Sequence, residues 1–157
     1  MPTHAERRPL PYTPQQMYDL VAAIEKYPEF LPWVQGIRIT KRETDTVYAD
    51  LIVGFRMFRE SFTSKVSLAP PDVIDVKYLK GPLKYLNNHW RFEPDGKGGC
   101  IVDFYVDFEF KSRIFQKVAG TLFNEAVRRM IHAFESRAEE IYGRKNGRSA
   151  KGSLKEA

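Results

Sequence analysis

Residues 103–142 read DFYVDFEF-KS-RIFQKVAGTLFNEAVRRMIHAFESRAEEIY, a strand pattern that runs directly into a helix pattern. In Asp103–Phe110, four apolar side chains alternate with four polar or amphipathic ones, which predicts a strand with one dry face and one wet face. Ser112 then predicts the start of a long helix that ends at about Tyr142, with Gly143 after it. Apolar residues recur along this helix at 3.6-residue spacing. Such a helix must cover the dry face of a sheet.

The segments upstream supply that sheet. Alternating apolar positions predict strands over residues 34–41, 47–56, 62–68, 74–78 and 84–93. Thr3–Leu10 precedes them and is predicted to be an edge strand, because Pro9 and Pro11 close it. The sequence therefore predicts an antiparallel sheet of about six to seven strands.

Two short helical segments are expected after the first strand. Thr13-Pro14 has the character of an N-cap followed by proline at the first helical position, and apolar residues follow at helical spacing up to Ile24. The bend Tyr27–Trp33 contains two prolines and is expected to hold one helical turn. The predicted fold class is α+β, with a curved antiparallel sheet wrapped round the long C-terminal helix and a cavity where the sheet curls away.

Composition limits the classes of protein. The chain has 157 residues and 43% hydrophobic residues, which favours one folded domain over a disordered chain. We place that domain at residues 1–143 and expect a flexible basic tail at 144–157, which carries most of the net charge of +5. A nearly neutral body argues against DNA as a partner. No apolar stretch is long enough to span a membrane and no signal core is evident, so the protein is expected to be soluble and cytoplasmic.

Enzyme signatures are sparse. His4, His89 and His132 lack partners at metal-ligand spacing, so no metal is expected. Residues 96–99 form a predicted hairpin turn without a phosphate-loop pattern. The single cysteine, Cys100, is interpreted as structural. No catalytic residue is therefore assigned.

Several stretches, taken in order, resemble the coenzyme-Q-binding branch of the START-domain superfamily, together with its bacterial relatives. This superfamily shares the helix-grip fold with birch-pollen-type plant allergens and polyketide cyclases. The resembling stretches are YPEFLPW at 27–33, VGF at 53–55, ESFTS at 60–64, GPL at 81–83, WRF at 90–92 and VDFEF at 106–110.

The resemblance implies a chaperone-like protein that binds ubiquinone or another polyprenyl lipid and supports respiration, with no cofactor required. It also implies peripheral contact with the cytoplasmic face of the inner membrane. One alternative is a ribosome-association toxin that hinders the joining of ribosomal subunits. Another is a cyclase or dehydratase that uses Arg56, Glu60 or Tyr78, although Arg56 and Glu60 flank a presumed turn where a surface salt bridge is the better interpretation.

The quinone hypothesis needs apolar walls with a few polar groups. The expected ligand-binding residues on the strands are Leu51, Val53, Phe55, Phe62, Ser64, Val66, Tyr78, Asn88, Trp90, Phe92, Phe104, Val106 and Phe108. Those on the helix are Val118, Leu122, Phe123 and Ala126. Taken singly, each of these residues is more often a plain core residue, and this is expected to hold for most of them.

Two sets of residues leave alternatives open. Asn88 stands on an apolar strand face, where it either satisfies backbone groups or meets a ligand. Tyr27, Phe30, Leu31 and Trp33 either gate the mouth of the pocket or insert into a membrane interface, or they plug one end of the core.

Overall fold

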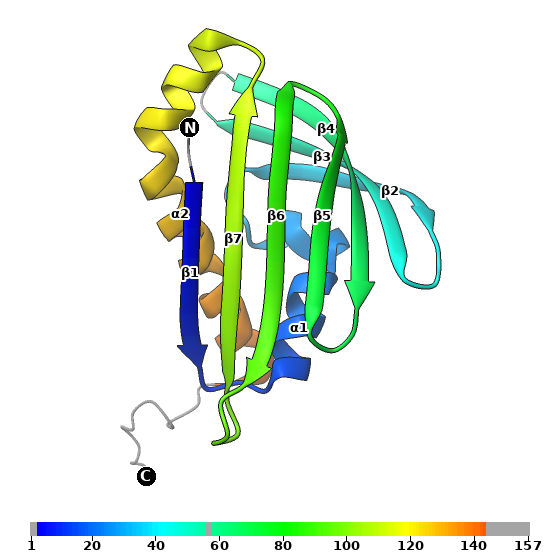
Figure 1. The fold of residues 1–157 in the computed structure, drawn as a ribbon, viewed down its shortest axis with the longest axis vertical. Helices are drawn as coiled ribbons and strands as arrows, with labels where there is room; N and C mark the ends of the chain where they lie inside the picture. The colour runs from blue at the N-terminus through cyan, green and yellow to red at the C-terminus, as the bar shows by residue number, and fades with distance from the viewer. Residues whose placement is uncertain (1–2, 56–57, 144–157) are drawn as a thin grey trace.

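The computed structural model describes residues 3–55 and 58–143, without the side chains of residues 55, 58 and 119. It contains seven strands, two α-helices and one 3-10 helix (Figure 1). Their order is β1 (Thr3–Leu10), α1 (Pro14–Ala22), η1 (Ile24–Glu29), β2 (Val34–Arg42), β3 (Thr46–Phe55), β4 (Phe58–Ala69), β5 (Val73–Lys80), β6 (Leu83–Pro94), β7 (Cys100–Phe110) and α2 (Arg113–Tyr142). The predicted fold class and order of elements are confirmed. The expected tail at 144–157 lies outside the described residues.

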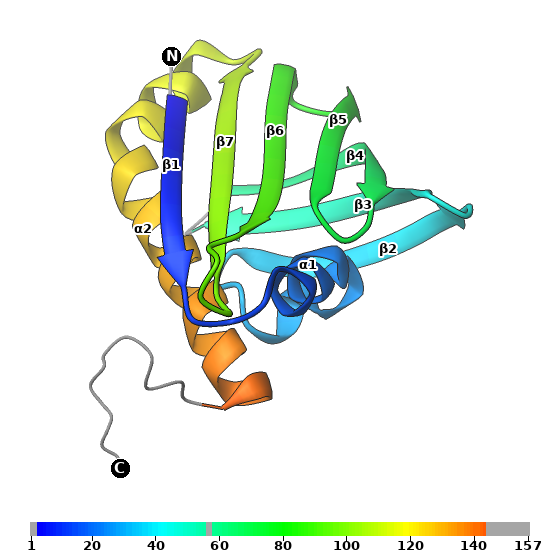
Figure 2. The same ribbon diagram turned by 60° about the horizontal axis from the view of Figure 1, so that its bottom comes forward.

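The seven strands form one antiparallel sheet in the order β1-β7-β6-β5-β4-β3-β2. β1 pairs with β7 from Thr3↔Asp107 to Leu10↔Cys100 and lies at an edge of the sheet, as predicted. Register shifts occur in the β2–β3, β4–β5 and β6–β7 ladders, including one between Thr63 and Ser64. Such irregularities bend strands and increase twist, and Figure 2 shows the sheet curling round one side of α2.

The beginning of α1 follows from local chemistry. The Thr13 hydroxyl accepts a hydrogen bond from the Gln16 N–H at 3.0 Å, and the Gln16 side chain accepts one from the Thr13 N–H at 2.9 Å. This reciprocal capping box, with Pro14 at the first helical position, satisfies amides that have no partner within the helix. The face of α1 with Met17, Leu20 and Val21 is buried.

α2 begins and ends where the sequence predicted. The Ser112 hydroxyl accepts a hydrogen bond from the Phe115 N–H, and Gly143 follows the last turn with a φ of 85°. This left-handed backbone favours glycine, which lacks the Cβ that would be strained there. The helix packs against the inner face of the sheet and passes behind β1 and β7 in the view of Figure 1.

The two halves of α2 meet different neighbours. Near its C-terminal half, α1 and η1 fill the space beside the sheet (Figure 2). There the Tyr142 hydroxyl donates to the Gln16 carbonyl at 2.8 Å, and the Phe134 ring packs 5.3 Å from the rings of Phe30 and Trp90. We call this region the filled end. The opposite region, with the N-terminal half of α2 and the β5–β6 and β7–α2 connections, is called the cavity end.

Candidate functional site

A cavity of about 480 Å³ lies between the N-terminal half of α2 and the sheet. β7 supplies one wall, because the alternation predicted for Asp103–Phe110 points Val106, Phe108 and Phe110 inward. The ring of Phe108 packs 5.6 Å from Phe123 of α2, and the ring of Phe110 packs 5.8 Å from Phe115. These aromatic contacts join helix and sheet round the cavity and leave it open in the middle.

Eight of the residues predicted to bind a ligand line this cavity. They are Val53, Phe62, Val106, Phe108, Val118, Leu122, Phe123 and Ala126. Trp33, predicted as a mouth residue, also lines it. The backbone holds Trp33 in place, since its carbonyl accepts a hydrogen bond from the Gly54 N–H at 2.9 Å.

The site prediction missed several apolar wall residues. They are Gly54, Pro82, Leu83, Leu86, Phe110 and Phe115. Leu86, Phe110 and Phe115 belong to the predicted apolar patterns, so they were omitted because only part of each pattern was assigned to the ligand site. Pro82 lies in the β5–β6 turn and Leu83 begins β6. No local sequence pattern indicates that this turn borders a cavity.

Three polar side chains mark the place where the cavity meets solvent. Arg129 and Glu125, one turn apart on α2, form an ion pair at 2.7 Å, and both side chains are more than half exposed. Glu60 on β4 is half-buried and also borders the cavity. The mouth thus offers charged groups, while the interior offers almost only carbon.

Eight other predicted ligand-binding residues lie outside the cavity walls. They are Leu51, Ser64, Val66, Tyr78, Asn88, Trp90, Phe92 and Phe104. Val66 and Phe92 are buried in the core of the filled end, and Trp90 packs beside that core. The Phe55 side chain lies outside the described residues. For all of these, ligand contact stays a prediction.

Two polar members of that group have structural partners. The Asn88 side-chain amide donates to the Tyr105 carbonyl at 2.9 Å, and its oxygen accepts from the Trp90 indole N–H at 3.2 Å. These contacts favour the backbone-satisfying interpretation of Asn88. The Tyr78 hydroxyl accepts a hydrogen bond from the Leu83 N–H at 2.9 Å, and so it holds the β5–β6 turn.

The four residues singled out in the bend at 27–33 have different surroundings. The Tyr27 hydroxyl donates to the Val21 carbonyl at 2.5 Å, and burial raises the pKa of this phenol. Tyr27 and Phe30 pack against Phe134, and Leu31 is buried in the same cluster. These three residues plug the filled end, and Trp33 alone of the four reaches the cavity.

The described residues offer little catalytic chemistry. Burial raises the pKa of the Cys100 thiol to about 11, so the thiol stays neutral and unreactive near pH 7. No cluster of three or more potential metal ligands occurs among residues 3–55 and 58–143. Arg56, one of the residues weighed for a cyclase, lies outside the described part of the chain. What the cavity can do is enclose an apolar molecule and hold its polar end at the mouth.

A second hollow, shallow and on the outer side of α2, is chemically different. It lies between η1 and α2 and is bordered by Phe30, Pro32 and several charged residues. Arg137 crosses it, donating to Glu29 at 2.6 Å and Glu140 at 3.2 Å with its guanidinium 5.1 Å from the centre of the Phe30 ring. These ion pairs occupy the Arg137 guanidinium, and Phe30, Pro32 and Ala133 are the only apolar residues among the described ones that border the hollow, so the apolar cavity remains the better candidate site.

Comparison with known proteins agrees with this geometry. Residues 10–135 match the model of a family described as polyketide cyclase / dehydrase and lipid transport. The chain is 35% identical over 136 residues to the ribosome association toxin RatA of Rickettsia prowazekii, covering 84% of this chain and 92% of that protein.

It is also 35% identical over 145 residues to the mitochondrial coenzyme Q-binding protein COQ10 homolog B of Xenopus laevis, covering 90% of this chain and 59% of that protein. The aromatase/cyclase Zhui of a Streptomyces species has the same fold, with a TM-score of 0.78 at 14% identity over 96% of this chain and 98% of the other. No helix among the described residues is long and apolar enough to cross a membrane.

Proposed function

The chain belongs to the polyketide cyclase / dehydrase and lipid transport family, and from this premise we propose that it is a carrier that binds a polyprenyl quinone such as ubiquinone. One observation carries the proposal: an apolar cavity of about 480 Å³, walled by aromatic and aliphatic side chains, opens beside charged groups. A relative named as a coenzyme Q-binding protein supports the choice of ligand. Such a carrier would support respiratory electron transport without performing chemistry itself.

The size of the cavity sets how much of the ligand it encloses. A space of about 480 Å³ suits a molecule of ordinary drug size. We therefore propose that it holds the quinone ring near the mouth and the first isoprene units deeper inside, while the rest of the isoprenoid chain extends beyond the cavity walls. Burial of each CH₂ group contributes about 0.8 kcal/mol. Isoprene units outside the cavity do not gain this free energy, so short-chain and long-chain quinones should bind with similar affinity.

The orientation follows from the distribution of polar groups. The guanidinium of Arg129 stands at the mouth and has donors beyond those used by Glu125. A quinone carbonyl accepts hydrogen bonds, so we propose that Arg129 and the Trp33 indole lie nearest the ring. The aromatic wall of Phe108, Phe110 and Phe115 then packs against the apolar part of the ligand.

The two tryptophans of the chain provide a direct test. Trp33 lines the cavity, whereas Trp90 packs in the core between Phe92, Phe104 and Phe134. Titration with a short-chain ubiquinone should quench Trp33 fluorescence by contact. The Trp33→Phe variant should lose most of this quenching, and Trp90→Phe should keep it. Equal loss in both variants, or no saturable quenching in the wild type, would overturn the proposal.

A matched pair of variants on α2 gives an independent test. Ala126→Phe places a ring in the cavity, whereas Thr121→Phe places the same ring on the exposed side of the helix. Mass spectrometry of lipids extracted from the purified protein should find quinone with the wild type and Thr121→Phe, and little with Ala126→Phe. Folding of each variant is checked by circular dichroism.

A second candidate function is association with ribosomal subunits. The chain covers nearly the whole of the Rickettsia relative that bears this name. The outer face of the sheet also places Lys65 directly opposite Lys77, a like-charge pair that destabilises a sheet but would suit a polyanion. Lys77 is exposed, and the Lys65 ammonium lies 6.0 Å from the centre of the Tyr48 ring. Salt-sensitive co-sedimentation with ribosomal subunits that Lys65→Glu/Lys77→Glu abolishes would support this function.

A further inference from the structure

The cavity end exposes large apolar side chains. Ile114, in the first turn of α2, is 71% exposed, and Leu79, at the end of β5, is 45% exposed. Their two segments are neighbours, because the Lys111 N–H donates to the Pro82 carbonyl at 2.9 Å. Pro82 and Phe115 of the same segments line the cavity. An apolar pair is thus presented to solvent beside the cavity walls.

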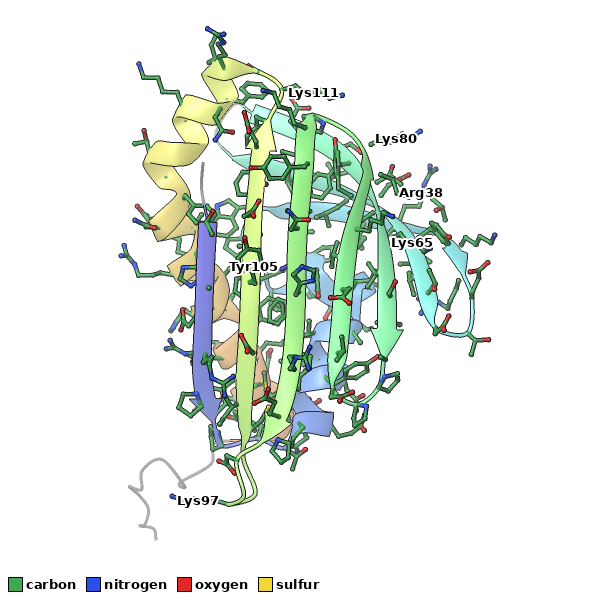
Figure 3. All side chains as sticks on the ribbon, viewed as in Figure 1. Arg38, Lys65, Lys80, Lys97, Tyr105 and Lys111 are labelled. Atoms are coloured by element: carbon green, nitrogen blue, oxygen red, sulfur yellow. The ribbon has the colours of Figure 1, made fainter. Side chains whose placement is uncertain are left out.

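Cationic side chains surround this apolar pair. Lys80 accompanies Leu79, while Lys111, Arg113 and Lys117 accompany Ile114, and all four residues are exposed. The ion pairs among the described residues include none of the four, although the charge of Lys80 acts from farther away on the Asp50 carboxylate, which pairs with Arg38. Figure 3 shows Lys80 and Lys111 at the same end of the molecule, with Lys97 at the opposite end.

The position of these cations is unfavourable for the isolated fold. The N-terminus of a helix carries a partial positive charge and favours anions. The first turn of α2 nevertheless contains no acidic residue, and it begins with Arg113, directly after Lys111 and Ser112. An external anionic surface would relieve this repulsion, which points to a partner that bears negative charge.

We propose that this rim, comprising residues 79–82 and 111–117, docks on an anionic lipid bilayer. The cations contact lipid headgroups while Ile114 and Leu79 enter the boundary of the acyl region. The proposal extends the quinone-carrier function, since docking would bring the cavity walls to the membrane from which such a ligand comes. The docking surface differs from the bend at 27–33, where Tyr27 and Leu31 are occupied in packing.

A bilayer fits the rim better than a nucleic acid does. RNA would neutralise the cations but would leave the aliphatic side chain of Ile114 in water. A bilayer accommodates both kinds of group at once, because its anionic headgroups lie directly above its hydrocarbon. RNA is therefore treated as a competing outcome of the experiment.

The experiment measures co-sedimentation of the lipid-free full chain with vesicles that contain phosphatidylglycerol and no quinone. Removing one cation near an anionic surface should weaken binding about fivefold. Lys80→Glu/Lys111→Glu should therefore weaken binding more than tenfold, and Ile114→Asp about tenfold. The matched controls are Lys97→Glu and Ile141→Asp at the opposite end, where Ile141 is 50% exposed; both should bind as the wild type does.

Each other outcome overturns the docking proposal. Equal binding of all variants would assign vesicle binding to another part of the chain. Binding to purely neutral vesicles with the same affinity would remove the role of the cations. Loss of RNA binding in the rim variants, with vesicle binding unchanged, would assign the rim to nucleic acid. Binding of quinone in the absence of vesicles tests the carrier function separately. Cavity variants should lose this quinone binding, and rim variants should keep it.

Discussion

At the filled end, α1, η1 and the plugging bend pack beside α2 against the sheet, whereas at the cavity end α2 faces the sheet alone. The same helix and the same strands serve both ends. At the filled end, Phe134 touches aromatic rings from the bend and from β6. At the cavity end, Phe108 and Phe110 make contacts with α2 that bridge the gap without closing it. The difference shows that the hollow arises because α1, η1 and the bend do not extend to the cavity end, while the strand and helix patterns stay the same.

The largest expected effect on stability comes from removing one aromatic ring at each end. Phe92 is 1% exposed and packs edge-on against Tyr18 of α1. We expect Phe92→Ala to lower the free energy of unfolding by about 3–5 kcal/mol, because the lost ring leaves a void that cannot collapse. Phe108→Ala should cost only about 1–2 kcal/mol, since this ring already borders empty space. Urea denaturation measures both free energies of unfolding. Equal losses in the two variants would contradict the distinction between the filled end and the cavity end.

The next effect comes from adding volume. Ala138 is fully buried at the filled end, and Ala126 lines the cavity on the same helix. We expect Ala138→Leu to destabilise the fold by about 1–3 kcal/mol through overpacking, whereas Ala126→Leu should change the free energy of unfolding by less than about 1 kcal/mol. Thermal melting of the two variants checks this. A destabilised Ala126→Leu variant would mean that the cavity is not free to accept a ligand.

A smaller effect compares the helix caps. Thr13 at the filled end forms a full capping box, whereas Ser112 at the cavity end accepts a longer bond of 3.3 Å from Phe115. Thr13→Ala should cost about 1 kcal/mol, and Ser112→Ala should cost less. Hydrogen exchange of the first amides in α1 and α2 reports each cap locally. A larger loss of protection for Ser112→Ala than for Thr13→Ala would contradict this ranking of the two helix caps.

The smallest effect concerns pH and the turns at the two ends. In the β6–β7 turn, the Lys97 and Gly99 N–H groups donate to the Asp95 carboxylate at 2.7 and 2.9 Å, and these bonds lower the pKa of Asp95. Because this pKa is lower in the folded state, Asp95 stabilises the fold above the ordinary Asp pKa, and this stabilisation disappears as pH falls through the lowered pKa.

The measurement is urea denaturation between pH 2 and 6. Asp95→Asn should flatten the acid side of the stability profile. Tyr78→Phe, which removes the acceptor for the Leu83 N–H in the β5–β6 turn, should shift stability equally at every pH in this range. A profile for Asp95→Asn that parallels the wild type would show that the turn carboxylate does not contribute.

Local patterns explain how much the sequence could predict. The alternation in Asp103–Phe110 identified the strand and its inward face, and Thr13, Ser112 and Gly143 marked helix ends because caps depend on a few adjacent residues. The position of the cavity along each strand depends on which part α1 covers, and that packing leaves no local pattern. Trp90 and Phe108 therefore looked alike in sequence, although one packs beside the core and the other lines the cavity.

The place of β1 in the sheet has a consequence for the order of assembly. Strands β2 to β7 each pair with a neighbour in the chain, but β1 pairs with β7, and the partners Arg7 and Asp103 stand 96 positions apart. During synthesis from the N-terminus, the earliest strand must wait until every other strand has been made. Contacts across such a separation form slowly, and a waiting strand can pair with another chain. The arginines and Pro9 of β1 discourage such pairing while the nascent chain grows.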